Sequence, residues 1–125
     1  MTIDSFMFTP NRNDEIVRIL VGLGIKRNVA KVLVYLVDVI EGPSRMIERG
    51  TDLRQPEVSV ALKWLIQTGW VESREGRAEG KGRPVKMFRL VRTMAEVIGM
   101  IEQEKVRDAE HQRVLLARLK EIVLK

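Results

Sequence analysis

The segment from residue 53 to residue 90 constrains the fold of this chain more than any other part of the sequence. After Pro56, which suits the first position of a helix, apolar residues recur at i, i+3, i+4 and i+7: Val58, Ala61, Leu62 and Leu65. This spacing predicts an amphipathic helix with one buried side. Residues 70–74 and 85–90 have the composition of two strands around a glycine-rich turn. We therefore expect a short helix followed by a β-hairpin.

Helical spacing also precedes this segment. Asn13 suits the N-cap of a first helix that ends near Gly22 and Gly24. A second helix is predicted over residues 27–40. Its apolar stripe indicates the central helix of the core and consists of Val29, Val32, Leu33, Leu36, Val39 and Ile40.

A short helix and a tight turn connect this core helix to the helix at Pro56. The short helix is predicted from Ser44 to Arg49, with Met46 and Ile47 turned inward and Gly50 at its end. Two helices joined by a tight turn form a helix-turn-helix unit. The expected fold is mainly α, of the α+β winged-helix class: a helix-turn-helix with a β-hairpin wing and a long C-terminal helix.

The excess positive charge of the chain is concentrated on the predicted hairpin. The net charge is +5, and residues 70–92 hold seven lysines and arginines against three glutamates. Residues 1–69 and 93–125 are each close to neutral. A local basic cluster fits a surface that contacts phosphate groups. It is equally compatible with a hairpin that is charged only for solubility.

Residues 93–125 predict one long helix, with Thr93 as its N-cap. Its ends are apolar, its middle is polar, and its heptad pattern is broken at Lys105, Asp108 and Gln112. Apolar ends without an intrachain core favour pairing with a second copy of the chain. The predicted dimerisation residues are Met94, Val97, Ile98, Ile101, Leu115, Leu119 and Ile122. The alternative is a helix that bends and packs on its own domain.

The outward side of the helix at Pro56 carries few charges. At about 100° per residue, Pro56, Ser59, Val60 and Lys63 lie opposite the apolar side. A hydroxyl can bond either kind of base edge, a valine suits a thymine methyl, and a lysine suits guanine or phosphate. Glu57 is better explained by the positive end of the helix than by contact with a cytosine amine.

The tip of the hairpin, residues 75–84, adds basic side chains. Its glycines let the backbone approach DNA, so that Arg77, Lys81 and Arg83 can reach phosphates or enter a minor groove. The glycine spacing is not that of a phosphate-binding loop, because the four-residue gap and the Ser/Thr are missing. The predicted DNA-binding residues are Arg54, Gln55, Pro56, Ser59, Val60, Lys63, Arg77, Lys81, Arg83 and Lys86.

Several function classes are disfavoured by what the sequence lacks. It contains no cysteine, which removes disulfides, thiol nucleophiles and cysteine zinc sites. The single histidine, His111, removes a two-histidine metal site within one chain. No catalytic residue, metal or cofactor is therefore predicted, and an enzyme is not expected. No apolar run reaches about 18 residues, and residues 1–13 make a poor secretory signal, so that no membrane span and a cytoplasmic location are expected.

Three stretches resemble a known family. They are Gln-Pro-Glu-Val-Ser-Val-Ala-Leu-Lys-Trp-Leu at 55–65, Thr-Gly-Trp-Val at 68–71 and Gly-Arg-Pro-Val-Lys-Met-Phe-Arg-Leu at 82–90. Residues 14–92 are similar to the winged helix-turn-helix domain of MarR/TrmB/ArsR-type transcriptional regulators, especially small archaeal ones. The resemblance implies that residues 55–65 form the recognition helix, that Lys81 and Arg83 lie on the wing, and that the flanking helices form a dimer.

The chain departs from these families in two respects. It lacks the large C-terminal effector domain of full TrmB-type regulators and the metal ligands of metal-sensing ArsR-type members, and the sequence identifies no small-molecule effector. We expect an N-terminal arm (1–13), a DNA-binding domain (14–92) and a dimerisation helix (93–125). The expected function is sequence-specific binding of double-stranded DNA by a homodimeric transcriptional regulator, with repression favoured over activation. The alternative is a winged-helix module that binds protein without sequence-specific DNA binding.

Overall fold

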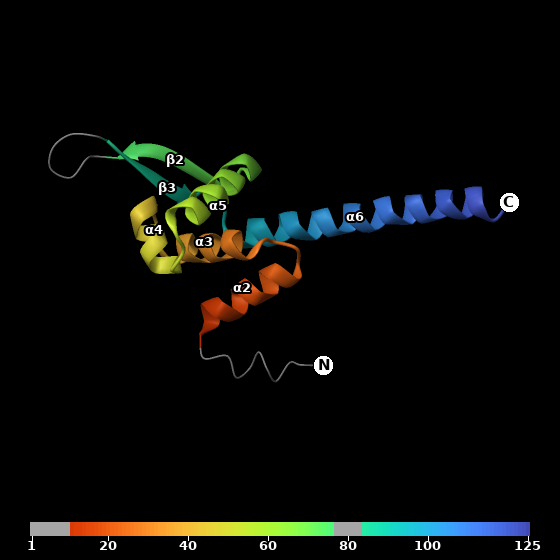
Figure 1. Cartoon of the computed structure of the whole chain (residues 1–125), viewed down its shortest axis with the longest axis horizontal. Helices are drawn as coiled ribbons and strands as arrows, with labels where there is room; N and C mark the ends of the chain where they lie inside the picture. Colours follow the sequence, from red (N-terminus) through yellow and green to blue (C-terminus); the bar gives the residue numbers. More distant parts are fainter. Residues whose placement is uncertain (1–10, 77–83) are drawn as a thin grey trace. The chain divides into compact units, whose positions relative to one another are not determined.

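The computed structural model describes residues 11–76 and 84–125. Labelled as in Figure 1, its elements are α2 (Arg12–Gly22), α3 (Arg27–Asp38), β1 (Gly42–Pro43), α4 (Ser44–Thr51), α5 (Gln55–Thr68), β2 (Val71–Gly76), β3 (Val85–Leu90) and α6 (Met94–Val123). The predicted α+β winged-helix class is confirmed, because the helix-turn-helix α4–α5 is followed by the antiparallel hairpin β2–β3 and then by a long helix. The boundary between two compact units falls after Arg92.

Helix α2 starts earlier than the sequence analysis predicts. The side-chain oxygen of Asn11 accepts a hydrogen bond of 2.8 Å from the backbone N–H of Asn13, which makes Asn11 the N-cap. The assignment of Asn13 as the cap is therefore wrong, because the earlier asparagine satisfies the free backbone donors. The side-chain amide of Asn13 instead donates to Asp38 on α3 at 2.8 Å. Val17 and Leu20 are the buried residues of α2.

Helix α3 supplies much of the core of the unit that ends at Arg92. Val29, Val32, Leu33 and Leu36 are buried as predicted, and Ala30 and Val34 are buried with them. The prediction is wrong for Ile40, which is 88% exposed. Helix α3 ends at Asp38, and the backbone of Val39 is extended. Ile40 therefore does not continue the buried side of the helix.

Helix α4 packs closely against α3 and runs past its predicted end. A Cβ atom on Gly50 would lie 1.9 Å from the ring carbon Cε1 of Tyr35, so a glycine is needed where the two helices approach. The helix continues to Thr51, and Asp52 in the left-handed conformation (φ 58°) follows it. Ile47 is buried as predicted, whereas Met46 is 43% exposed and not turned inward.

Helix α5 has the buried side that its sequence predicts. Val58, Ala61, Leu62 and Leu65 are all buried. At its N-terminus a Glu57 carboxylate oxygen accepts a hydrogen bond of 2.9 Å from the backbone N–H of Arg54. At its C-terminus Gly69 adopts φ 87°, as a residue without a Cβ can do at no steric cost.

The described residues form a three-stranded antiparallel sheet in the order β1-β3-β2. In the hairpin, Val71 pairs with Leu90, Ser73 with Phe88 and Glu75 with Lys86. Strand β1 is a finding that the sequence analysis missed, because two residues that include a proline carry no strand signal. Val71 and Phe88 are buried, as is Trp70, whose ring meets Trp64 of α5 edge to face at 5.5 Å.

Helix α6 begins with a reciprocal cap, as predicted from Thr93. The hydroxyl oxygen of Thr93 accepts from the Glu96 N–H at 3.1 Å, and the Glu96 carboxylate accepts from the Thr93 N–H at 2.8 Å. Val97 and Ile101 are its only buried residues within the described chain. Among the described helices, none is both long enough and apolar enough to cross a membrane.

Candidate nucleic-acid interface

The outward side of α5 exposes the residues that the sequence analysis assigned to DNA. Gln55, Pro56, Ser59, Val60 and Lys63 are all exposed, and Val60 is 69% exposed. From Val58 to Thr68 the helix contains no aspartate or glutamate. Arg54 is also exposed, at the N-cap of α5. The uncovered side of this helix therefore offers hydrogen-bonding groups, one methyl-bearing side chain and positive charge, with Glu57 in the first turn as the only carboxylate of the helix.

Lys86 of the wing lies beside this surface. A groove of about 300 Å³ is lined by Gln55, Ser59 and Lys63 from α5 and by Lys86 from β3. Side chains alternate between the two faces of a strand, so Lys86 shares the face of Phe88, which is buried. The structure thus brings together residues that are more than twenty positions apart in the sequence.

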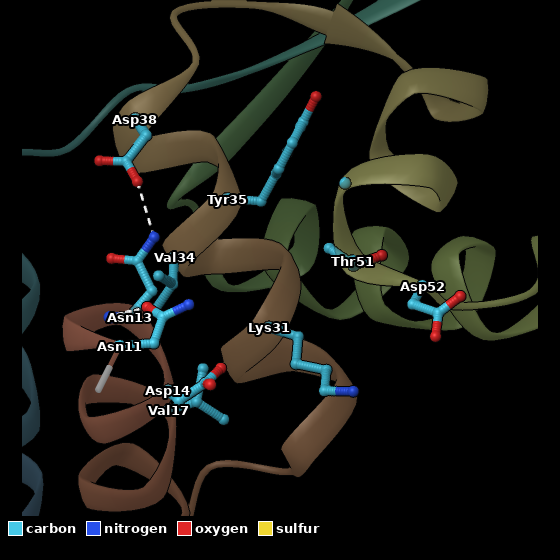
Figure 2. A pocket seen from close by; sticks show the side chains of 11 residues that line it. Asn11, Asn13, Asp14, Val17, Lys31, Val34, Tyr35, Asp38, Thr51 and Asp52 are labelled. Atoms are coloured by element: carbon cyan, nitrogen blue, oxygen red, sulfur yellow. Dashed lines mark hydrogen bonds between the residues drawn. The ribbon is translucent and has the colours of Figure 1, made fainter. Parts of the chain in front are cut away.

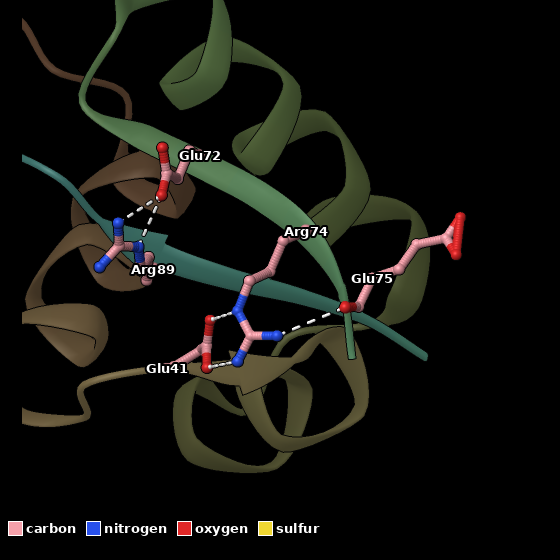
Figure 3. Close-up of polar contacts among 5 residues, drawn as sticks. All are labelled: Glu41, Glu72, Arg74, Glu75 and Arg89. Atoms are coloured by element: carbon pink, nitrogen blue, oxygen red, sulfur yellow. Dashed lines mark hydrogen bonds and ion pairs between the residues drawn. The ribbon is translucent and has the colours of Figure 1, made fainter. Parts of the chain in front are cut away.

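Arg74 and Arg89 of the hairpin form ion pairs with glutamates, which Figure 3 shows. Arg74 Nε donates to one Glu41 oxygen at 2.7 Å and an Arg74 terminal nitrogen donates to the other at 2.6 Å. This hydrogen bonding, together with the negative charge of Glu41, raises the pKa of Arg74 above its ordinary value. Arg89 forms a cross-strand pair with Glu72 at 2.6 Å.

These ion pairs refine the interpretation of the basic cluster. By alternation, Arg74 and Arg89 lie on the face of the hairpin opposite Lys86. Lys86 forms no ion pair within the described residues. Arg74 and Arg89 are therefore already paired with carboxylates, whereas Lys86, which lies opposite Glu75 in the strand register, has no such ion pair with a described residue. The partner Glu41 could not have been identified from the sequence, because it lies 33 residues before Arg74.

A second basic flank of α5 was missed by the sequence analysis. On the side of α5 away from Lys86, a groove of about 460 Å³ is lined by Lys26, Arg27 and Asn28 and, from α5, by Pro56, Glu57 and Val60. Lys26 and Arg27 are exposed. Helix α3 has no side-chain cap and no acidic residue in its first turn, so its positive end adds to the charge of these two side chains. The adjacent Lys-Arg pair is visible in the sequence, but its position beside α5 depends on how α3 and α5 pack.

The remaining predicted contacts fall into two groups. Glu57 accepts the Arg54 N–H, which agrees with its interpretation as a helix N-terminal residue and not as a reader of cytosine. Arg77, Lys81 and Arg83 lie outside the residues that the structure describes.

A third concavity lies away from the exposed side of α5, between α2, α3 and α4 (Figure 2). Its volume is about 350 Å³, and its lining is polar, with Asn13, Lys31, Tyr35, Asp38 and Asp52 among the contributing residues. Within the described part of the chain, no three His, Cys, Asp or Glu side chains are grouped closely enough to hold a metal ion.

The arrangement of α3, α4, α5 and the β2–β3 hairpin defines a winged helix-turn-helix protein. Comparison with solved structures gives the same fold. A possible transcriptional regulator from Methanosarcina mazei superposes with a TM-score of 0.59 at 16% identity, over 82% of this chain and 83% of that one. The MarR family transcription regulator SP03579 gives 0.54 at 13% identity, over 90% and 76% of the two chains.

A third structure, the MarR family regulator NMB1585 from Neisseria meningitidis, gives a TM-score of 0.50 at 18% identity, over 84% of this chain and 78% of that one. The resemblance to winged-helix transcriptional regulators that the sequence indicated therefore extends to the fold. No protein-family model matches the sequence, and no curated protein is detectably similar to it.

Proposed function

We propose that this protein is a homodimeric transcriptional regulator that binds double-stranded DNA in a sequence-specific manner. One observation carries the proposal: the exposed side of α5 has no carboxylate between Val58 and Thr68, and a basic groove lies along each of its flanks. A helix with this surface is suited to the major groove, where base edges face it and phosphates lie on both sides.

Each side chain takes the role that its chemistry permits. Gln55 and Ser59 hydrogen-bond base edges, and Val60 contacts a thymine methyl group. Lys63 reaches a guanine or a phosphate. These assignments are supported by the exposure of all four side chains on one side of α5.

Phosphate contacts flank the bases. On one flank Lys86 contributes from β3. Arg77, Lys81 and Arg83, which lie between the two strands in the sequence, supply further phosphate contacts in this proposal. On the other flank Lys26 and Arg27 contribute from the start of α3, and Arg54 lies at the N-terminus of α5. Phosphate contacts position a protein on DNA without reading its sequence, and they make the affinity depend on salt.

The dimer would form through α6, whose predicted interface residues Ile98, Leu115, Leu119 and Ile122 are each more than half exposed. Val97 and Ile101 are already buried within the single chain, so the exposed residues supply the surface for a partner. Twofold symmetry would place two recognition helices in successive major grooves, about 34 Å apart. A dimer bound across an operator would block access to that DNA, which favours repression.

Selection of bound duplexes from a random DNA pool tests this proposal. We expect the full-length protein to enrich an inverted repeat with half-sites about one helical turn apart. The double variant Ser59→Ala/Lys63→Ala should change the enriched sequence, whereas the matched control Arg74→Ala should leave it unchanged, because Arg74 is paired with Glu41. Failure to enrich any sequence, with weak binding even at low salt, would favour a winged-helix module that binds protein.

A further inference from the structure

Helix α6 has two charged residues near its centre, Lys105 and Asp108, that form no ion pair with the described residues. Lys105 and Asp108 stand three residues apart, at the same spacing as the pairs Glu110–Arg113 and Arg118–Glu121 on the same helix. Those two pairs form ion pairs of 2.6 and 2.9 Å, whereas Lys105 and Asp108 form none with any described residue. Their side chains are free to meet charges on another molecule.

The two residues lie on a regular stripe that runs the length of α6. Steps of four and three residues alternate along Met94, Ile98, Ile101, Lys105, Asp108, Gln112, Leu115, Leu119 and Ile122. Such alternation is the heptad spacing of one seam of a two-stranded coiled coil. The three polar residues in the middle interrupt the apolar seam, and they also restrict the ways in which two copies can pair.

The charges distinguish a parallel from an antiparallel pair. In a parallel pair each residue meets its own copy, so lysine would face lysine and aspartate would face aspartate within the seam. In an antiparallel pair with the twofold axis between residues 106 and 107, Lys105 meets Asp108 of the partner subunit. The symmetry repeats this contact, which gives two ion pairs at the centre.

We propose that two copies of this protein pair their α6 helices antiparallel in this register. The proposal rests on the homodimer of the proposed function and specifies how that dimer is built. Ile98 then faces Leu115 of the partner subunit, and Met94 faces Leu119 of the partner subunit. Ile98 is 51% exposed and Leu115 is 55% exposed in the single chain, so both have surface to bury.

The neighbouring antiparallel registers fit less well. A shift of one heptad in one direction sets Lys105 against Leu115 of the partner subunit, and a shift in the other sets Ile98 against Asp108 of the partner subunit. Each shift buries a charge against an aliphatic side chain, which is unfavourable. In the proposed register Ile101 faces Gln112 of the partner subunit, and each leucine of the stripe that meets the partner's first half, Leu115 and Leu119, faces an apolar residue.

Charge exchange on the full-length chain tests the central contact. Lys105→Asp and Asp108→Lys each replace two attractive contacts by two repulsive ones, and each should raise the dimer Kd by about tenfold or more. The combined variant Lys105→Asp/Asp108→Lys restores opposite charges and should return the Kd close to that of the wild type. Arg107→Glu, a reversal on the same helix outside the stripe, is the matched control and should leave the Kd nearly unchanged. Sedimentation equilibrium measures all four values.

Cysteine cross-linking tests the direction of pairing. The natural chain has no cysteine, so introduced thiols are the only ones present. Positions 98 and 115 lie about 25 Å apart along one helix, too far for a disulfide within a chain. The double variant Ile98→Cys/Leu115→Cys should therefore form a covalent dimer on oxidation, and each single variant should not. Parallel pairing would instead cross-link Ile98→Cys alone.

The outcomes separate this inference from the proposed function. A dimer whose single cysteine variants cross-link, or whose charge exchange is not restored in the combined variant, overturns the register but leaves a homodimeric regulator. A wild-type chain that stays monomeric at micromolar concentration and on DNA overturns both the register and the homodimer.

Discussion

Helices α5 and α6 are both amphipathic, but they differ in what they leave uncovered. Helix α5 buries its apolar side within its own unit and exposes hydroxyl, amide and ammonium groups. Beyond Ile101, helix α6 leaves large apolar side chains exposed, among them Leu115, Leu119 and Ile122. A polar, cationic surface suits nucleic acid, whereas an exposed apolar seam suits another protein chain. The chemistry of the exposed side of each helix therefore indicates the kind of partner that the helix suits.

Local interactions do not account for the stability of the C-terminal part of α6. Its ion pairs Glu110–Arg113 and Arg118–Glu121 are exposed, and such pairs contribute only about 0.2–0.5 kcal/mol each. Most helix stability in proteins comes from packing an apolar side against other residues. Burial of Leu115, Leu119 and Ile122 against a second copy would supply that packing.

The largest effect is expected from removing the exposed part of α6. A chain truncated after Glu104 keeps the whole of the compact unit that ends at Arg92, so the winged-helix unit should still fold. Loss of the paired helices should make it monomeric, and its affinity for an inverted repeat should fall about a hundredfold or more because two-site binding is lost. Sedimentation and DNA titration measure both quantities. A truncated chain that remains dimeric would remove α6 as the main interface.

The next largest effect is the difference in the free energy of unfolding between substitutions on the two sides of α5. Leu65 is fully buried, and Leu65→Ala should lower the free energy of unfolding by about 2–5 kcal/mol. Val60 is 69% exposed, and Val60→Ala should change it by less than about 0.5 kcal/mol while weakening binding to sites that contain the contacted thymine. Urea unfolding at one fixed protein concentration provides the comparison, since dimer stability depends on concentration. Equal losses of stability would contradict the assignment of Val60 to a binding surface.

The buried side of α5 could be predicted because it depends on local periodicity alone. Four apolar residues at helical spacing identify the side that packs, and the opposite residues follow from geometry. The face of Lys86 is likewise determined by the two-residue period of a strand. These features do not depend on contacts between residues that are distant in the sequence.

Other features depend on contacts that are distant in the sequence. Glu41 pairs with Arg74 because β1 and β2 both flank β3, and β1 itself has no sequence signal. Ile40 continues the apolar pattern of α3 but lies beyond the point where the helix ends. Lys26 and Arg27 reach the flank of α5 only through the packing of α3 against α5. Each of these required the tertiary structure.

A smaller effect is expected from single changes on the exposed side of α5. Ser59→Ala and Lys63→Ala should each reduce discrimination at one base pair, by about 1–3 kcal/mol where the contact is bidentate and less for a single hydrogen bond. Neither change should affect folding, because both side chains are exposed. Competition between sites with single substitutions measures the preference. Weaker binding with unchanged preference would make these residues phosphate contacts.

The smallest effect is a change in the salt dependence of DNA affinity. It distinguishes basic residues proposed to contact phosphates from Arg74, which is paired with Glu41. In Lys26→Ala/Arg27→Ala, two proposed phosphate contacts are lost, so the slope of log affinity against log salt should flatten by about 2. Preference among sequences should be unchanged, because phosphate contacts carry no base information. Arg74→Ala removes one basic residue from the hairpin, but its charge is already matched by Glu41, so the slope should stay the same. A flattened slope in Arg74→Ala and none in the double variant would mean that DNA contacts the outer face of the hairpin and not the groove at α3.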